Sequence, residues 1–191
     1  SELAEMACRI EIDMLGAPIG KQDQYAVAHG GLNFIEFLRN GDVIVNPIII
    51  SENFQHELND NLLLFYTGIS RKSNDILMNK KVMTAREIKE NQSQSVELAR
   101  QLRDALYSEN LNQFSELLSE GWELKKRTGT RITNKKIEQW HETALNCGAK
   151  SGKLLGAGGG VGDSPLARLG SYRRQRSDST GIGAAVSGAW Q

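Results

Sequence analysis

The stretch that decides the fold is GAPIGKQDQYAVAHGGLN, residues 16–33. Its glycines let the backbone turn sharply and approach a ligand closely. An acidic side chain in such a loop, here Asp23, can accept a proton from a substrate hydroxyl or orient that hydroxyl. Alone the pattern is weak, because an aspartate between glycine and proline residues is more often a turn former.

A second glycine-rich run, KLLGAGGG, spans residues 153–160. Backbone N–H groups in a glycine run can approach a phosphate because no Cβ is in the way. Glycine runs are also common in linkers, so a flexible linker explains this segment equally well when it is taken singly. The two stretches are more informative together, in this order along the chain, than either is alone.

The segments around the first stretch have clear periodicity. A helix before Gly16 is predicted to pack one face on a core, because apolar residues recur there at spacings of three and four: Leu3, Ala7, Ile10 and Met14. Residues 33–37 alternate in polarity, residues 43–45 are rich in β-branched side chains, and Asn40-Gly41 lies between them. A β-hairpin is therefore predicted, with Pro47 ending its second strand or beginning the next connection.

The middle of the chain predicts one strand and then helices. Residues up to Leu58 are interpreted as a connection, and the apolar run of residues 62–66 as a short buried strand. Thr84 and Glu87 have the spacing of a capping box. Three apolar stripes predict helices that follow: Leu98, Leu102, Ala105 and Leu106; then Leu111, Phe114, Leu118 and Trp122; then Ile137, Trp140 and Ala144. The fold class is α+β.

Bulk composition excludes few functions. Lys plus Arg and Asp plus Glu are 23 each among 191 residues, so net charge favours neither nucleic acid nor an anionic membrane as a partner. Cys8 and Cys147 lie far apart without metal-ligand spacing and are predicted to be reduced and buried. With no membrane-spanning run and no signal-peptide pattern, a cytoplasmic protein is expected. The start at Ser1 in helix-like sequence suggests a missing upstream segment.

The two glycine-rich stretches, together with LLFYTGISR at residues 63–71, make the chain resemble the GHMP kinases, over about residues 2–160. Within that family the general likeness is to the bacterial heptose-phosphate kinases. The resemblance implies the end of a ribosomal-protein-like N-terminal domain at residues 1–56 and a ferredoxin-like α+β domain at 57–160, incomplete at both ends. Residues 161–191, poor in large apolar side chains, are expected to be a disordered tail outside the family pattern.

The resemblance also implies roles for particular residues. Asp23 matches the aspartate that faces the substrate hydroxyl, with Gly20 and Gln24 beside it on the substrate, and Glu11 matches the glutamate that holds the Mg²⁺ of ATP. The glycine-rich motif predicted to shape the ATP site comprises Gly156, Ala157, Gly158, Gly159 and Gly160. Arg71 is a candidate for an anionic group on a phosphorylated sugar, although a surface arginine at a strand end is an equal reading.

The sequence departs from the family in two places. The family's main phosphate-binding loop, of the Gly-Leu-Gly-Ser-Ser type, is absent, so little or no catalysis is expected of this chain by itself. After Gly160 the family's apolar strand is also absent, and a shifted reading frame is one hypothesis for that change, a genuine tail another. The expected activity is ATP-dependent phosphorylation of a sugar or sugar phosphate. The alternatives are another GHMP small-molecule kinase, fucose-type or mevalonate-type, and a non-catalytic helical interaction module.

Overall fold

A computed structural model describes residues 1–17, 19–65, 67, 84–127, 132–155 and 171–172. The helices are α1 (Glu2–Cys8), the π-helix η1 (Arg9–Met14), α2 (Gln22–His29), α3 (Glu52–Asn61), α5 (Ala85–Tyr107), α6 (Leu111–Arg127) and α7 (Lys135–Asn146). The strands are β1 (Asn33–Phe37), β2 (Val43–Pro47), β3 (Ala149–Ser151) and β4 (Ser171–Tyr172). This mixture confirms the α+β class.

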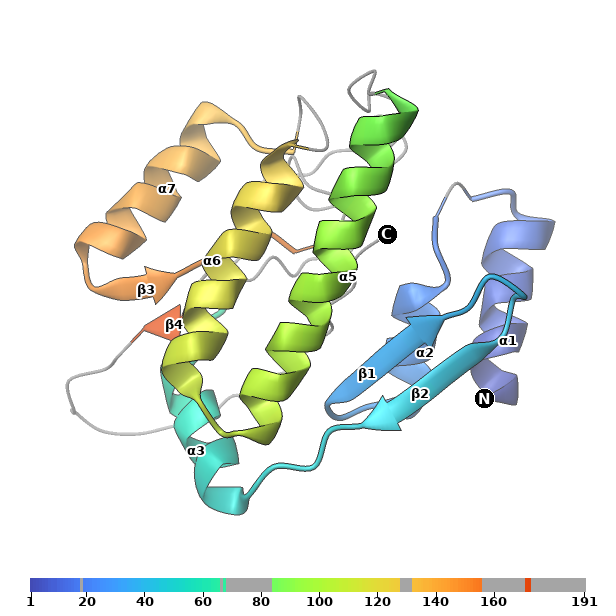
Figure 1. Ribbon diagram of the computed structural model, residues 1–191, viewed down its shortest axis with the longest axis horizontal. Helices are drawn as coiled ribbons and strands as arrows, with labels where there is room; N and C mark the ends of the chain where they lie inside the picture. Colours follow the sequence, from blue (N-terminus) through green and yellow to red (C-terminus); the bar gives the residue numbers. More distant parts are fainter. Residues whose placement is uncertain (18, 66, 68–83, 128–131, 156–170, 173–191) are drawn as a thin grey trace.

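The predicted hairpin is present and forms a layer between helices (Figure 1). β1 and β2 pair antiparallel, with Asn33 opposite Pro47 and Phe37 opposite Val43, so Pro47 is the last residue of the second strand. Gly41 in the turn has φ 93°, a left-handed conformation that glycine adopts without strain. The Asn-Gly signal therefore located the turn correctly.

The two faces of β1 contact different helices, as the alternation of a strand requires. Ile35 packs against a cluster of buried residues from α1 and α2, namely Ala4, Cys8 and Tyr25. Phe34 packs against the larger cluster formed by α3, α5 and α6. The guanidinium of Arg103 on α5 lies 4.8 Å from the centre of the Phe34 ring. The hairpin thus joins the α1–α2 pair to the rest of the molecule.

The long helices α5 and α6 lie side by side and carry the main core (Figure 1). Leu98, Ala105 and Leu106 of α5 are buried together with Phe114 and Leu117 of α6, which confirms the predicted stripes. Thr84 caps α5 with its side chain accepting from the backbone N–H of Glu87, and the Glu87 side chain accepts in return from the Thr84 N–H, so the predicted capping box is present.

Residues 52–66 differ from expectation. The predicted connection is helix α3, capped by Ser51, with Phe54 and Leu58 buried one turn apart. The predicted strand is absent from the described residues 62–65: Leu62 forms one isolated bridge, and residues 63–65 have no regular structure and are 37–50 % exposed. A short apolar run becomes a buried strand only where neighbouring strands pair with it, and the described residues supply no such ladder. The predicted domain boundary at residue 56 falls inside α3 and stays a prediction.

The first helix is present, but its predicted buried face is wrong. Leu3, Ile10 and Met14 are 65 %, 45 % and 72 % exposed, whereas Ala4 and Cys8 are buried. Small side chains allow α1 to approach α2 closely, and the wider π-helical turn from Arg9 rotates the later positions. Apolar spacing predicted a helix here without predicting which of its faces meets the core.

The last described elements pack around Trp122. Trp122 on α6, Ile137 on α7 and Leu154 after β3 are buried together, and Trp140 packs against them. β3 pairs antiparallel with β4, so Ser171–Tyr172 is a strand within the tail predicted to be disordered. For the rest of residues 161–191 the prediction lies outside the described residues. Cys8 is buried and reduced as predicted, but Cys147 is exposed, because it follows the end of α7 at the surface.

Candidate functional site

Asp23 and Gln24 lie in the first turn of α2 rather than in a loop, which corrects the prediction for Asp23. Gly20 lies just before Lys21, the N-cap of the helix, and Gly16, with φ 66°, follows the end of η1. Asp23 is exposed while Gln24 is only 7 % exposed. An acidic residue in the first helical turn is favoured by the helix dipole. The exposed side chain of Asp23 is accessible to a substrate.

Glu11 and Gln24 are joined directly. The Gln24 Nε2 atom donates a hydrogen bond of 2.7 Å to the Glu11 Oε2 atom, linking η1 to α2. The Oε1 atom of Gln24 is buried and accepts no hydrogen bond within the part of the chain that is described. The structure therefore joins Glu11 to Gln24 at the start of α2, next in sequence to Asp23, and the predicted roles of these three residues in a site stay predictions.

Tyr25 fixes α2 in place behind these residues. It is 3 % exposed, its hydroxyl donates a hydrogen bond to the Glu5 carboxylate on α1, and its ring meets that of Phe37 edge to face at 5.9 Å. Burial and the Glu5 hydrogen bond raise the pKa of Tyr25 to about 12, so the phenol is neutral at ordinary pH. The contacts of Tyr25 with Glu5 and Phe37 therefore fix the position of the helix that carries Asp23 and Gln24.

Two lysines that sequence reasoning did not assign to the site have lowered pKa values, and the charge of Asp23 acts on one of them. Lys153 follows β3 and is only 8 % exposed, and burial, with the charge of Lys125 adding to it, lowers its pKa to about 7. Burial also lowers the pKa of Lys125 on α6 to about 8, while the charge of Asp23 acts in the opposite direction. The Lys125 Nζ atom donates to the Leu154 carbonyl oxygen at 3.3 Å. The charge of Asp23 thus acts on Lys125, and the charge of Lys125 acts on Lys153.

No sequence signal marks Lys125. It begins the run Lys125-Lys126-Arg127 at the end of α6, where basic residues usually interact with the helix dipole in solvent. Lys153 was visible only as the residue that opens the glycine-rich run. A lysine flanked by small and apolar residues, in Gly152-Lys153-Leu154-Leu155, was the available hint.

The remaining predicted site residues fall elsewhere. Arg71 and residues 156–160 lie outside the described residues, so their assignments stay predictions. Among the described residues no group of three or more His, Cys, Asp or Glu side chains is placed to hold a metal ion. Glu11 is a single carboxylate, and a carboxylate oxygen is the donor that Mg²⁺ prefers. The donor chemistry fits Mg²⁺ if ATP oxygens and waters complete the shell.

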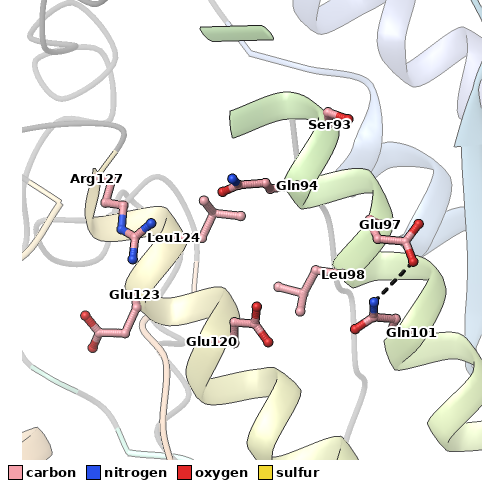
Figure 2. Close-up of a pocket in the computed structure, with 9 residues that line it drawn as sticks. All are labelled: Ser93, Gln94, Glu97, Leu98, Gln101, Glu120, Glu123, Leu124 and Arg127. Carbon is pink, nitrogen blue, oxygen red and sulfur yellow. Dashed lines mark hydrogen bonds between the residues drawn. The ribbon is translucent and has the colours of Figure 1, made fainter. Parts of the chain in front are cut away.

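A hollow of about 360 Å³ between α5 and α6 lies apart from these residues (Figure 2). Glu97 on α5 and Glu120 and Glu123 on α6 line it, and Gln101 donates to Glu97 at 3.1 Å. Three carboxylates outnumber the one guanidinium there, that of Arg127, so the hollow would repel a phosphorylated ligand. None of the predicted site residues lines this hollow, so we do not assign it a role in phosphate chemistry.

Comparison with known proteins places this arrangement in context. Residues 102–162 match the family model for the GHMP kinase C-terminal domain. Over 160 residues the chain is 35 % identical to the D-glycero-alpha-D-manno-heptose 7-phosphate kinase of Campylobacter jejuni, covering 83 % of this chain and 47 % of that protein. The chain thus spans about half the length of this curated relative.

Solved structures show the same likeness. A protein described as a sugar kinase from Campylobacter jejuni superposes with a TM-score of 0.59 at 32 % identity, covering 88 % of this chain and 46 % of that one. A D-glycero-D-manno-heptose 1-phosphate kinase from Bacteroides thetaiotaomicron gives 0.53 at 26 %, covering 88 % and 52 %. Mevalonate kinase from L. major, at 21 % identity and 0.53, covering 82 % and 46 %, shows the fold alone. None of the described helices is long and apolar enough to cross a membrane.

Proposed function

We propose, because this chain belongs to the GHMP kinase family, that it is the part of an ATP-dependent sugar kinase that orients the acceptor hydroxyl for phosphoryl transfer. The observation that carries the proposal is the grouping of Asp23, Gln24 and Glu11 at the start of α2, with Lys125 under the influence of the Asp23 charge. Glu11 lies in η1, whereas Asp23 and Gln24 lie in α2. The hydrogen bond from Gln24 to Glu11 joins the two elements directly.

The reaction needs few protein groups. The acceptor hydroxyl oxygen forms a bond to the γ-phosphorus of ATP while the bond from that phosphorus to the ADP oxygen breaks, and the hydroxyl proton is released. Asp23 accepts this proton or holds the hydroxyl in line. The buried Oε1 atom of Gln24 offers an acceptor to a second sugar hydroxyl while the Nε2 atom keeps its hydrogen bond to Glu11.

Glu11 would hold Mg²⁺ through a carboxylate oxygen. Bound Mg²⁺ would neutralise negative charge on the ATP phosphates. The protein's own contribution is the 2.7 Å hydrogen bond from Gln24, which orients the Glu11 carboxylate. Loss of that bond would loosen the metal ligand without removing it.

The acceptor we propose is a heptose phosphate. Support comes from two relatives above 25 % identity, one a kinase of a heptose 7-phosphate and one of a heptose 1-phosphate. Because the chain covers 47 % and 52 % of those two proteins, the assignment of the whole activity is a proposal for this chain.

The test is a chimera in which this chain replaces the matching half of the Campylobacter jejuni kinase. We expect ATP-dependent phosphorylation of D-glycero-D-manno-heptose 7-phosphate, and we expect Asp23→Asn to lower kcat by about 10²- to 10⁴-fold, the usual contribution of a positioned acid or base. Asp60→Asn, at an exposed position on α3, is the matched control and should leave kcat unchanged.

A folded chimera without sugar-dependent ATP turnover would contradict the kinase proposal. Equal kcat values for Asp23→Asn and Asp60→Asn would support the kinase proposal but would contradict the proposed role of Asp23. Turnover with fucose or mevalonate instead of a heptose phosphate would retain the family chemistry and replace the acceptor.

A further inference from the structure

The first helix is apolar on two sides. Ala4 and Cys8, which are 0 % and 3 % exposed, pack with Tyr25 of α2. A second set of apolar side chains on α1 and η1 lies outside that contact and is 45–72 % exposed: Leu3, Met6, Ile10 and Met14. Spacings of three and four residues place such side chains along one face of a helix. We call these four residues the outer stripe.

A helix of this kind is normally covered on both sides. A surface helix carries charged and polar residues on its outer face, whereas a helix that is apolar all round is buried. Single exposed apolar residues are ordinary, but contiguous ones mark an interaction site. Leu15, directly after η1, continues the outer stripe and is 74 % exposed. No described element covers this face, and α1 lies at the edge of the molecule opposite α7 (Figure 1).

The relatives indicate what covers the outer stripe. The chain corresponds to 47 % of the Campylobacter jejuni heptose phosphate kinase, and to 46 % of the sugar kinase from that organism that superposes with a TM-score of 0.59. Each of these proteins therefore has about as much chain again that this chain does not match. The model for the C-terminal domain matches residues 102–162, so α1 belongs to the part of the fold outside that domain. The unmatched half of such a kinase has to pack against the matched half within one molecule.

We propose that the outer stripe is the surface on which the other half of a GHMP kinase fold packs. The occupant presents an apolar surface, because burying these side chains removes apolar area from water. Met6 and Met14 suit such a contact, since flexible methionine side chains adapt to the shape of a partner. The inference rests on the proposed function, because η1 also carries Glu11, the proposed Mg²⁺ ligand, so the docked half would lie beside the proposed metal site.

Oxidation of the native methionines tests this contact without any substitution. Hydrogen peroxide converts methionine to its sulfoxide, and mass spectrometry of peptides measures the rate at each position. Met6 and Met14, 55 % and 72 % exposed, should oxidise in the 191-residue chain almost as fast as in the same chain unfolded in urea. In the folded chimera with the Campylobacter jejuni half, both should oxidise more slowly, by about tenfold or more, because the sulfur atoms are covered.

A charged substitution gives an independent readout. Leu3→Glu should leave the urea midpoint of the 191-residue chain nearly unchanged, because Leu3 is 65 % exposed. In the chimera it should lower the midpoint, because the carboxylate would be buried against an apolar surface. Val96→Glu, at a 48 % exposed position on α5 outside the outer stripe, is the matched control and should have the same effect in both proteins.

The outcomes separate this proposal from its alternatives. Equal oxidation rates of Met6 and Met14 in the chain and in the folded chimera would overturn it, as would equal effects of Leu3→Glu in the two proteins. If a second copy of this chain were the occupant, oxidation of Met6 would slow as the concentration of the 191-residue chain rises, and that result would also overturn it. Protected methionines in a chimera without kinase activity would support the docking surface and contradict the proposed function. An active, Asp23-dependent chimera with unprotected methionines would do the reverse.

Discussion

Lys153 makes the stability of the fold depend on pH. Its pKa falls from 10.5 to about 7 on folding, mainly because of burial. Between these values the unfolded chain carries more protons than the folded chain, so the free energy of unfolding rises with pH, by up to about 1.4 kcal/mol per pH unit. Lys125, lowered to about 8, acts in the same direction over a narrower range. Urea unfolding at intervals from pH 7 to pH 10 measures this slope.

Lys153→Met isolates the contribution of one group. The variant should be more stable than the parent chain at pH 7, and the difference should shrink as pH rises toward 10. Above pH 10 the high pKa of Tyr25 introduces a loss of stability in both proteins, because the folded chain then keeps a proton that the unfolded chain releases. A difference that is constant between pH 7 and pH 10 would contradict the assignment of the slope to Lys153.

Gln24 should matter more for the substrate than for the fold. Gln24→Leu removes its hydrogen bond to Glu11 but also removes a buried oxygen that accepts no bond from the described residues. The two effects oppose each other, so the free energy of unfolding should change by less than about 1 kcal/mol. In the chimera the KM for the heptose phosphate should rise several-fold. Urea unfolding and steady-state kinetics measured together check this, and a large loss of stability with unchanged KM would contradict it.

At the scale of an element, α5 depends on its capping box. Thr84→Ala removes the side-chain acceptor for the Glu87 N–H and should lower the free energy of unfolding by about 1 kcal/mol, a typical value for an N-cap. Ser93→Ala, at an exposed position inside α5, is the matched control and should be neutral or slightly stabilising, since alanine is the better helix former. Equal changes in the free energy of unfolding for the two substitutions would show that the Thr84 cap does not stabilise the fold.

The turn between α5 and α6 holds the start of α3. Both the backbone N–H and the hydroxyl of Ser51 donate to the Glu109 carboxylate, at 2.7 and 2.9 Å. Glu109 has φ 53°, which is strained for a residue with a Cβ. Glu109→Ala keeps the strain and loses both bonds, so it should cost about 1 to 3 kcal/mol. Glu109→Gly relieves the strain and should cost about 1 kcal/mol less. Urea unfolding of the two variants tests this explanation. A lower free energy of unfolding for Glu109→Gly than for Glu109→Ala would contradict it.

The sequence predicted the helices that have a long apolar stripe, α5 and α6, and it also predicted the β1–β2 hairpin. Local signals sufficed because spacing, capping and turn residues all lie within one element. The exposed residues 63–65 and the reversed face of α1 were not predictable in this way. Burial there depends on which other segments pack against the element. In the proposed site, Glu11, Asp23 and Gln24 come from the sequence motif and their roles stay predictions, whereas the position of Lys125 became visible only when the fold brought α6 against Leu154.

At the scale of the whole molecule, three clusters of buried residues stabilise the described part of the chain. α6 contributes Phe114 and Leu117 to one and Trp122 to another, so these two clusters are parts of a common body. The third, formed by Ala4, Cys8 and Tyr25, is the smallest and connects to that body through the hairpin. Stability need not be uniform in such an arrangement, because a small cluster can open while the larger ones stay packed.

The two cysteines report on this opening. Cys147 is exposed and should react with a thiol reagent at once, whereas Cys8, 3 % exposed, should react only when α1 separates from α2. We expect Cys8 labelling in the Cys147→Ser variant to give an opening free energy below that of global unfolding. Tryptophan fluorescence, to which the buried Trp122 contributes, follows global unfolding. Burial raises the pKa of Cys8 in the folded state, so the labelling rate must be referred to that of the unfolded chain at the same pH. Labelling that requires the same free energy as global unfolding would show that the α1–α2 pair and the α5–α6 core unfold as one unit, and that the site at the start of α2 is as rigid as the core behind it.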